Sequence, residues 1–393
     1  MIGGAAGGRS LPVSRRAAGI PSMELADLMR LANEAGAIDI ALGIPQLGPP
    51  VSAVTAATAA LSSGLHQYAP PAGLPGLRRM IANQFSSSGR GWDVDPGTEV
   101  TITCGATEAI MIALLSTTDP GDEVILLEPY FEVYPGMVEL AGAIPVPVPL
   151  TQPDWRLDMA AVASRITSRT RAILLNTPNN PTGSVLNRGE IRDLTNMCVE
   201  HGLACISDEV YERFVFDADH VSPASVPECR ERTIVAGSLS KSLRMTGWRL
   251  GYCVAEPGLT TVLRRVHERT TVGTSHPLQS GAAAVLPEDF CTAEMLRERR
   301  DAVSARLSGM GFDVQTPEGG WFVLAGVGPH SASSSQLARR LVTEAGVLVA
   351  PGTAFFSDRA EGERWIRVTF ARDPDATDKA LELLADFVAG QDR

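Results

Sequence analysis

The sequence predicts an α/β protein with a large, mainly parallel sheet covered by helices and a smaller α+β part. Apolar strand-like runs alternate with helical segments from Val100 to about Arg265, the pattern of a parallel sheet with helices on both faces. At least one buried run leads directly into a polar loop, where such sheets bind ligands. Beyond Pro287 a charged helix and short strands follow, which predicts the smaller part.

The composition is that of a soluble globular enzyme without a nucleic-acid partner. The 393 residues are 44% hydrophobic and 20% charged, which permits a large core. With 34 basic and 45 acidic residues the formal net charge is -11, so no basic excess is present to neutralise phosphates. No apolar run approaches the roughly 20 residues of a membrane helix, and the N-terminus lacks the apolar block of a secretory signal.

The six cysteines show neither a C-x-x-C pair nor the spacing of metal ligands. In a chain of this length they indicate free thiols in a reducing compartment. We therefore expect a cytoplasmic protein without a metal site. Residues 1–15 are expected to form a loose tail.

The first helical pattern runs from Met23 to Ala35 and gives way to the stretch I-D-I-A-L-G-I-P-Q-L-G-P-P, which cannot continue a helix. Gly43 in this stretch would let backbone approach a ligand closely, although a plain connecting loop explains it equally well. Tyr68 lies in a turn-rich segment before a helix that starts near Leu74. A packing role is the usual one for such a tyrosine.

The sheet pattern starts with the run Val100 to Thr103, the turn Cys104-Gly105 and an apolar helix. A strand, a glycine turn and a helix start form an anion site, because the first amides of a helix have no partners. After the turn Asp119 to Asp122, the strand V-I-L-L ends in the aromatic cluster E-P-Y-F-E-V-Y. Prolines in the next run, Ile144 to Val148, indicate an edge strand.

The strand Ala172 to Leu175 runs into the loop N-T-P-N-N-P-T-G. A helix from Arg188 to His201 and the strand L-A-C-I follow. Asp208 stands at the carboxyl end of that strand, and Tyr211 comes just beyond it. These two residues predict an acid–phenol pair at the edge of the sheet.

The strand Thr233 to Ala236 leads into S-L-S-K-S-L-R-M-T-G-W-R-L-G, and a further strand spans Leu250 to Val254. A lysine beside serines, such as Lys241, is common on a solvated surface. A reactive lysine needs a pocket that lowers its pKa and an electrophile such as an aldehyde. Ser238 and Arg249 would supply donors for a phosphate beside it.

The smaller part is expected to contain a helix with the sequence E-M-L-R-E-R-R-D-A-V and three short strands. These strands lie near Trp321 to Ala325, Val347 to Val349 and Trp365 to Phe370, before a last helix from about Ala376 to Val388. We expect residues 45–285 to form a large ligand-binding domain. Residues 16–44 and 286–393 are expected to form a small domain together.

The glycine turn, the aromatic strand exit, N-x-x-x-N, D-x-x-Y and S-x-x-K follow one another at strand ends. In this order they resemble the fold-type I pyridoxal-phosphate (PLP) enzymes, in particular the class I and II aminotransferases. The resemblance extends from about Gly43 to Phe370. It implies a seven-stranded sheet, PLP as the cofactor, and a homodimer with shared active sites. It also implies transfer of an amino group between an α-amino acid and a 2-oxo acid.

The resemblance also implies the catalytic roles. Lys241 matches the lysine that forms the Schiff base with PLP and later moves the proton. Asp208 matches the carboxylate that pairs with the pyridine nitrogen and keeps it protonated, which makes the cofactor an electron sink. Tyr211 and Asn180 match the groups that hydrogen-bond the phenolic oxygen of the ring. Asn176 lies in the same loop as Asn180.

Further residues are implied to bind the rest of the cofactor and the substrate. Phe131 would stack on the pyridine ring, and Arg367 in W-I-R-V-T-F would bind the α-carboxylate of the substrate, with the backbone near Gly43 facing the same group. Arg367 could otherwise be an ordinary surface residue of a strand. The phosphate would be bound by Gly105, Ala106, Thr107, Ser238, Arg249 and Tyr68 of the partner subunit.

Two other functions remain open. The same residues would serve a carbon–sulfur β-lyase or an oxygen-using amino-acid oxidase or decarboxylase, because the choice of bond depends on substrate orientation. The fold could also serve as the sensing module of a regulator, although there is no room for a DNA-binding domain before Gly43. Ser275 and His276 stand where a relative can carry a dicarboxylate-reading arginine, so a strict aspartate or glutamate preference is not expected.

Overall fold

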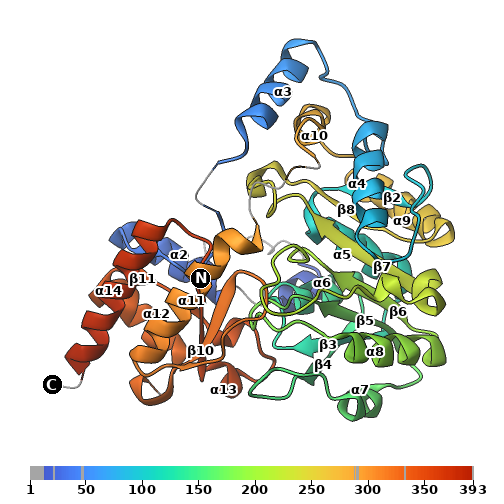
Figure 1. Ribbon diagram of the computed structural model, residues 1–393. Coiled ribbons are helices and arrows are strands. Elements are labelled where there is room, and N and C mark those ends of the chain that lie inside the picture. The colour runs from blue at the N-terminus through green and yellow to red at the C-terminus, as the bar shows by residue number, and fades with distance from the viewer. Residues whose placement is uncertain are drawn as a thin grey trace, which may run out of the picture.

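The computed structural model describes residues 13–20, 23–45, 48–286, 288, 292–331 and 333–391. Its centre is a seven-stranded sheet with the strand order β2-β8-β7-β6-β5-β3-β4 (Figure 1). The strands are β2 (Val100–Thr103), β3 (Glu123–Glu128), β4 (Ile144–Pro149), β5 (Thr170–Asn176), β6 (Ala204–Asp208), β7 (Thr233–Ser238) and β8 (Gly251–Val254). The mainly parallel seven-stranded sheet that the sequence predicted is confirmed.

Only β8 runs against its neighbours, because it pairs antiparallel with both β2 and β7. The connection from β7 to β8 contains no helix longer than the turn Thr246–Trp248, and a parallel crossover needs about a dozen or more residues, usually with a helix. The other strands point the same way, so their carboxyl ends meet at one edge of the sheet. The proline-bearing β4 lies at the end of the sheet, as predicted.

Helices cover both faces of the sheet because successive strand residues point to opposite faces and both sets are apolar. Leu126, Leu174 and Ile206 face one layer of helices, and Ile125 and Ile173 face the other. The first layer consists of α5 (Gly105–Thr117), α6 (Tyr134–Ala141) and α9 (Pro257–Thr270). The second layer consists of α4 (Pro75–Ser87), α7 (Met159–Arg165) and α8 (Arg188–His201).

A second, smaller sheet has the order β12-β13-β10-β9, and a two-stranded ladder joins β1 to β11. The strands are β1 (Ile38–Asp39), β9 (Asp313–Val314), β10 (Phe322–Gly326), β11 (Val347–Leu348), β12 (Ala350–Pro351) and β13 (Trp365–Thr369). The accompanying helices are α2 (Glu24–Ala35), α11 (Ala293–Gly309), α12 (Ser334–Arg340), α13 (Arg359–Gly362) and α14 (Pro374–Gln391). Pairing of β1 with β11 brings an early segment against this C-terminal part. The domain boundaries given above stay a prediction.

Eight helices were not named individually from the sequence: α6, α7, α9, α12 and α13, and also α1 (Arg15–Gly19), α3 (Val51–Ser62) and α10 (His276–Ala283). Helix α3 packs against α10 and stands away from the main body at the top of Figure 1. Short 3-10 or π-helical turns lie at Pro223–Ser225, Pro227–Arg232, Thr246–Trp248, Gly328–His330, Leu341–Ala345 and Gly352–Ala354. Of the predicted loose tail, residues 1–12 lie outside the described residues. Within the part of the chain that the structure describes, no helix is long and apolar enough to cross a membrane.

A buried ion pair joins α5 to α9 and to the loop before α4. The Nδ1 atom of His267 lies 2.8 Å from the Oε1 atom of Glu108, and its Nε2 atom lies 2.9 Å from the carbonyl oxygen of Pro71. Burial lowers the pKa of His267, but the bonds to Glu108 and Pro71 raise it more, so the net pKa is above its usual value. Because both ring nitrogens face acceptors, the folded protein favours the protonated form of His267.

We expect His267→Gln to destabilise the protein in a pH-dependent way. A raised pKa means that the folded protein holds the proton more tightly than the unfolded chain does. This stabilisation is therefore complete below the unfolded pKa of about 6.5 and is lost as the pH rises through the folded value. The variant should lose about 3 kcal/mol of unfolding free energy near pH 6, and the gap to the wild type should narrow towards pH 9.

Urea unfolding of the wild type and the variant across this pH range measures the difference in their unfolding free energies. The exposed His201→Gln is the matched control and should follow the wild type at every pH. A gap that is constant or widens with pH would contradict a protonated His267.

Candidate active site

The predicted site residues meet in one pocket at the carboxyl edge of the large sheet. Each one follows or ends a strand or starts a helix there, except Gly43 and Arg367, which enter from the side of the smaller sheet. The predicted residues that line the pocket are Gly43, Ala106, Thr107, Phe131, Asn176, Asn180, Asp208, Tyr211, Ser238, Lys241, Arg249 and Arg367. Gly105 is the first residue of α5 and precedes Ala106 and Thr107 of this lining. Tyr68 is apart from the pocket of its own chain and is 86% exposed.

Lys241 places a largely desolvated amine at the centre of the pocket. Its Nζ atom donates a hydrogen bond to the carbonyl oxygen of Gly43 at 2.9 Å and lies 4.9 Å from the ring centroid of Trp321. Burial and the nearby cations of Arg367 and Arg249 lower the pKa of Lys241 to about 8, although Asp208 acts in the opposite direction. A substantial share of the amine is therefore neutral, and nucleophilic, near physiological pH.

The chain contains only two lysines, which makes this placement decisive. Lys379 lies on α14, where its exposed amine pairs with Glu382 at 3.2 Å. Lys241 is thus the only lysine of the chain in the pocket.

Asp208 is buried at the end of β6 and is held by two donors. The Oη atom of Tyr134 donates to its Oδ2 atom at 2.6 Å, and the amide of Val210 donates to its Oδ1 atom at 3.1 Å. Burial raises the pKa of Asp208 to about 6 in spite of these bonds. A cationic partner in the pocket would therefore be stabilised strongly.

The acid–phenol pair predicted for Asp208 and Tyr211 needs a correction, because the phenol that bonds to Asp208 is that of Tyr134. The ring of Tyr211 instead lies between aromatic neighbours, 6.1 Å from Phe322 and 6.0 Å from Trp321 between centroids. Residue Tyr134 belongs to the aromatic strand exit E-P-Y-F-E-V-Y. That cluster was the only signal that could have pointed to it.

A chain of polar contacts links Asp208 to the arginine of the smaller sheet. The Nδ2 atom of Asn176 donates to the backbone oxygen of Asp208 at 3.0 Å, and its Oδ1 atom accepts the amide of Asn180 at 2.7 Å. The Oδ1 atom of Asn180 accepts a bond of 2.8 Å from the Nη1 atom of Arg367. The strand ends of the large sheet therefore fix the position of a residue on β13.

Arg367 is a buried cation, only 2% exposed. Its Nη2 atom donates to the carbonyl oxygen of Ala41 at 3.0 Å, and its guanidinium carbon lies 4.1 Å and 4.6 Å from the ring centroids of Phe322 and Phe355. Burial lowers its pKa, while Glu132 acts in the opposite direction. A guanidinium this desolvated gains much from a carboxylate ligand. Glu132, whose Oε2 atom is 3.8 Å from Nη1, was missed by the sequence reasoning.

The start of α5 forms a cradle for an anion. Gly105 has a φ of +74°, and the guanidinium of Arg249 lies against it so closely that a β-carbon there would be 2.5 Å from Nη2. Gly251 on β8 packs under the same turn, since a β-carbon on it would be 2.5 Å from the carbonyl carbon of Gly105. Free helix amides beside an arginine are the usual arrangement for a phosphate.

Comparison with known proteins places this geometry in a family. A family model described as aminotransferase class I and II matches residues 36–384. The probable N-succinyldiaminopimelate aminotransferase DapC of Mycobacterium tuberculosis is 36% identical over 92% of this chain and 94% of the relative. The aromatic-amino-acid aminotransferase 2 of Thermococcus litoralis is 34% identical over 88% and 90%. The chain belongs to the class I and II aminotransferases.

Solved structures agree with this assignment. N-succinyldiaminopimelate aminotransferase from M. tuberculosis superposes with a TM-score of 0.91 at 35% identity, covering 95% of this chain and 99% of that one. YbdL from Escherichia coli, whose structural study identified a methionine aminotransferase function, superposes with a TM-score of 0.90 at 29% identity over 96% and 100%. Of the reactions that the sequence left open, these findings support amino-group transfer between amino acids and 2-oxo acids.

Class I and II aminotransferases use PLP, and the pocket of this aminotransferase fits that cofactor. An aldehyde needs an amine that is partly neutral, which Lys241 offers, and a pyridine nitrogen needs a buried carboxylate, which Asp208 offers. The cradle at Gly105 and Arg249 suits the phosphate. Phe131 lines the same pocket, with its ring edge-on to that of Tyr134 at 5.6 Å between centroids.

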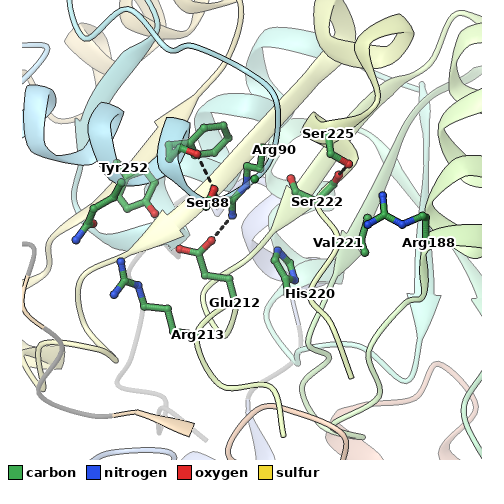
Figure 2. Close-up of a pocket in the computed structure, with 13 residues that line it drawn as sticks. Ser88, Arg90, Arg188, Glu212, Arg213, His220, Val221, Ser222, Ser225 and Tyr252 are labelled. Atoms are coloured by element: carbon green, nitrogen blue, oxygen red, sulfur yellow. Dashed lines mark hydrogen bonds and ion pairs between the residues drawn. The ribbon is translucent and has the colours of Figure 1, made fainter. Parts of the chain in front are cut away.

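The aminotransferase has a second pocket on the opposite side of β6, and Figure 2 shows it. Arg90 is its central residue: its Nη2 atom lies 2.8 Å from the Oε2 atom of Glu209 and also pairs with Glu212. Glu209 additionally bonds to the Nε2 atom of His220 at 3.0 Å and to the hydroxyl of Ser222 at 2.5 Å. Burial would raise the pKa of Glu209, but Arg90 and these hydrogen bonds lower it to about 2.

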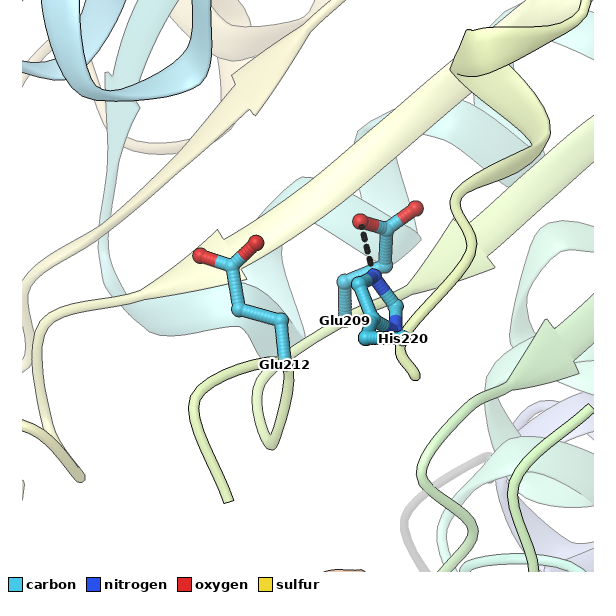
Figure 3. A group of neighbouring side chains, drawn as sticks. All are labelled: Glu209, Glu212 and His220. Carbon is cyan, nitrogen blue, oxygen red and sulfur yellow. Dashed lines mark hydrogen bonds and ion pairs between the residues drawn. The ribbon is translucent and has the colours of Figure 1, made fainter. Parts of the chain in front are cut away.

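Glu209, Glu212 and His220 have the spacing of a metal site, with ligand atoms within 4.8 Å of one another (Figure 3). The guanidinium of Arg90 already supplies the positive charge between the two carboxylates, so we assign no metal there. The network instead holds the segment between Asp208 and Glu212 from the side away from the active site.

We expect Gly251→Ala to weaken binding of PLP, because the added methyl group forces the first turn of α5 away from Arg249. The dissociation constant of PLP, measured by titrating the apoenzyme and following absorbance, should rise about tenfold or more. Gly247→Ala is the matched control, since a β-carbon there meets no atom within 4 Å. Equal affinities of the two variants would show that the cradle does not depend on this close packing.

Proposed function

We propose that the aminotransferase binds PLP covalently through Lys241 and uses the same amine to move the proton of the reaction. The observation that carries this proposal is the place of the lysines: of the two in the chain, one is desolvated in the pocket and the other is exposed on α14. When bound, PLP supplies an electron sink that makes the α-proton of an amino acid acidic. The Nζ atom of Lys241, with its lowered pKa, is suited to accept that proton and to return it.

Asp208 is proposed to keep the ring nitrogen of the cofactor protonated. Its carboxylate is buried, and Tyr134 and Val210 hold it in one orientation. Phe131 is proposed to cover the ring, a contact worth roughly 0.5–1.5 kcal/mol beyond burial. Tyr211 and Asn180 are proposed to bind the phenolic oxygen, with Asn176 orienting the loop that carries Asn180.

Arg367 is proposed to bind the α-carboxylate of the substrate. The bonds to Asn180 and Ala41 fix its guanidinium plane, and other hydrogens of its Nη atoms stay available for a forked carboxylate contact. The backbone at Gly43, which accepts the hydrogen bond of Lys241, lies on the same side of the pocket. The phosphate is proposed to bind Gly105, Ala106, Thr107, Ser238 and Arg249.

We further propose a homodimer in which Tyr68 of the partner subunit completes the phosphate site. Several large apolar side chains between residues 51 and 68 are exposed in the single chain: Val51, Val54, Leu61, Leu65 and Tyr68. Helix α3, which carries three of them, packs its alanine face against α10 and leaves an apolar face exposed that could contact a second copy. A patch of this kind on a chain of this family is best covered by the equivalent patch of another chain. A cytoplasmic location is also proposed, supported by the five free cysteines among the described residues.

Replacing Lys241 by alanine should abolish covalent retention of PLP and reduce turnover by about a thousandfold or more. Borohydride treatment of the holoenzyme followed by peptide mass analysis should place the cofactor on the peptide that contains Lys241. The control Lys379→Ala should keep both properties. Cofactor found on Lys379, or normal turnover without Lys241, would overturn the proposed role.

Mixed dimers of Lys241→Ala and Tyr68→Ala should be more active than either variant alone. In a mixed dimer with shared sites, one site receives an intact lysine from one chain and an intact tyrosine from the other. One intact site out of two predicts about half of the wild-type activity for the mixed dimer. To measure this activity, the two variants are co-expressed with different affinity tags, and the fraction that carries both tags is purified and assayed. Activity no higher than that of the Tyr68→Ala homodimer would contradict a shared site.

A further inference from the structure

The loop that carries Tyr68 is fixed to its own chain by one hydrogen bond. Among the described residues, residues 67–71 bond to another element only at the carbonyl oxygen of Pro71, which lies 2.9 Å from the Nε2 atom of His267 on α9. Apolar packing adds to this hold, since Ala69 is buried and a β-carbon on Gly273 would lie 3.5 Å from the Cα atom of Pro71. The exposed side chain of Tyr68 therefore takes its position from Pro71.

Little backbone freedom separates Pro71 from Tyr68. The connecting sequence is Y-A-P-P, in which each proline ring fixes its own φ near −65° and also restricts the residue before it. The amide of Gly73 donates to the carbonyl oxygen of Pro70 at 2.7 Å and closes a turn there. The bond that holds Pro71 therefore also sets the direction in which Tyr68 leaves the body.

His267 is in turn oriented from the phosphate cradle of its own chain. Its Nδ1 atom lies 2.8 Å from the Oε1 atom of Glu108, whose Oε2 atom accepts the amide of Cys104 at 2.5 Å. Cys104 directly precedes Gly105, where the cradle begins. The hydroxyl of Thr271 also donates to Oε1 of Glu108. One buried network thus extends from the cradle to the loop of Tyr68.

Stability alone gives little reason for this arrangement. Apolar side chains of similar volume often stabilise a core as well as a buried ion pair does, but they do not bond to backbone groups at chosen places. Here the two ends of the pair bond to the carbonyl oxygen of Pro71 and to the amide of Cys104. Both backbone groups belong to segments that are proposed to bind a phosphate.

We propose that His267 is a positioning residue for the cofactor site of the neighbouring subunit, because it holds the loop from which Tyr68 reaches the phosphate bound there. The side chain of His267 touches neither cofactor nor substrate and acts through Pro71 and Tyr68. Its effect is therefore expected in the site to which its chain gives Tyr68, and much less in the site built on its own Lys241. The inference rests on the proposed homodimer with a shared Tyr68.

Two mixed dimers with the same substitutions test this placement. In the first, a chain with both Lys241→Ala and His267→Gln pairs with a wild-type chain, so the one site with a lysine receives Tyr68 from the chain that lacks His267. In the second, a Lys241→Ala chain pairs with a His267→Gln chain, so the site with a lysine receives Tyr68 from a chain with an intact His267. A loss of stability caused by His267→Gln is common to both dimers.

The readout is the amount of PLP that borohydride fixes to Lys241 as PLP is titrated into each apo dimer, since the other site has no lysine. We expect the dissociation constant of PLP to be about tenfold higher in the first dimer than in the second. Glu268→Gln, next to His267 on the exposed side of α9, is the matched control and should give equal constants in both arrangements. If His267→Gln yields no folded dimer, Pro70→Gly replaces it in both, because it frees the backbone between Tyr68 and Pro71, and the same difference is expected.

The Tyr68→Ala background supplies a second readout that a merely structural role would not move. There His267→Gln should cause no further rise in the dissociation constant of PLP, because the residue that it positions is already gone. Equal constants in the two mixed dimers, a higher constant in the second, or a further rise in the Tyr68→Ala background would overturn the inference. If Tyr68→Ala alone binds PLP as tightly as the wild type, the proposed shared site fails instead.

Discussion

The cost of burying charge is the constraint on which this active site depends. An amine, a carboxylate and a guanidinium are all largely removed from water within one pocket: Lys241, Asp208 and Arg367. Burial shifts each pKa towards the neutral form. Asp208 only partly opposes this shift at Lys241, and Glu132 only partly opposes it at Arg367. Burial suits these groups to a PLP enzyme. It leaves Lys241 with an amine that can be neutral, and it makes Asp208 bind a cationic ligand group, and Arg367 an anionic one, more strongly.

The geometry that makes such burial tolerable comes from the sheet. Six parallel strands, all of the large sheet except β8, have their carboxyl ends at one edge, and the polar groups of successive loops hydrogen-bond to one another there. Asn176 on β5 bonds to the backbone of Asp208 on β6, and the loop after β5 bonds to Arg367 on β13. A network of this kind is most stable when every member is paired. The segment after Asp208 is also held from behind, since Glu209 points the other way into the pairing with Arg90.

Much of this arrangement could be predicted from the sequence because its signals are local. A glycine turn before a helix, a loop of asparagines and prolines after a strand, and an acidic residue at a strand end each occupy a few consecutive positions. The family resemblance then connected them, and nearly all of the residues it pointed to line one pocket. The edge position of β4 followed from its prolines alone.

The partners across the fold could not be predicted in the same way, because they are far apart in the chain. Tyr134 lies 74 residues before Asp208, and Arg90 lies 119 residues before Glu209. Tyr211 was the phenol predicted to pair with Asp208 because it is close in sequence, and Tyr134 was visible only as a member of the aromatic cluster that follows β3. Helix α3 was missed for a related reason: its small residues, V-S-A-V-T-A-A-T-A-A-L-S, carry a weak pattern, and its structure depends on packing against α10.

Contact with a second copy of the chain would account for the exposed position of Tyr68. A residue that is 86% exposed, beside a helix whose apolar side chains face solvent, gives little stability to a single chain. Placed against a second copy, the same segment would bury apolar surface and bring a phenol to the cradle of the neighbouring site. The cofactor would then contact both subunits, so association and cofactor binding would stabilise each other by linkage. The exposed segment of residues 51–68 and the charged pocket, which are separate in a single chain, would thus form one binding site together in the dimer.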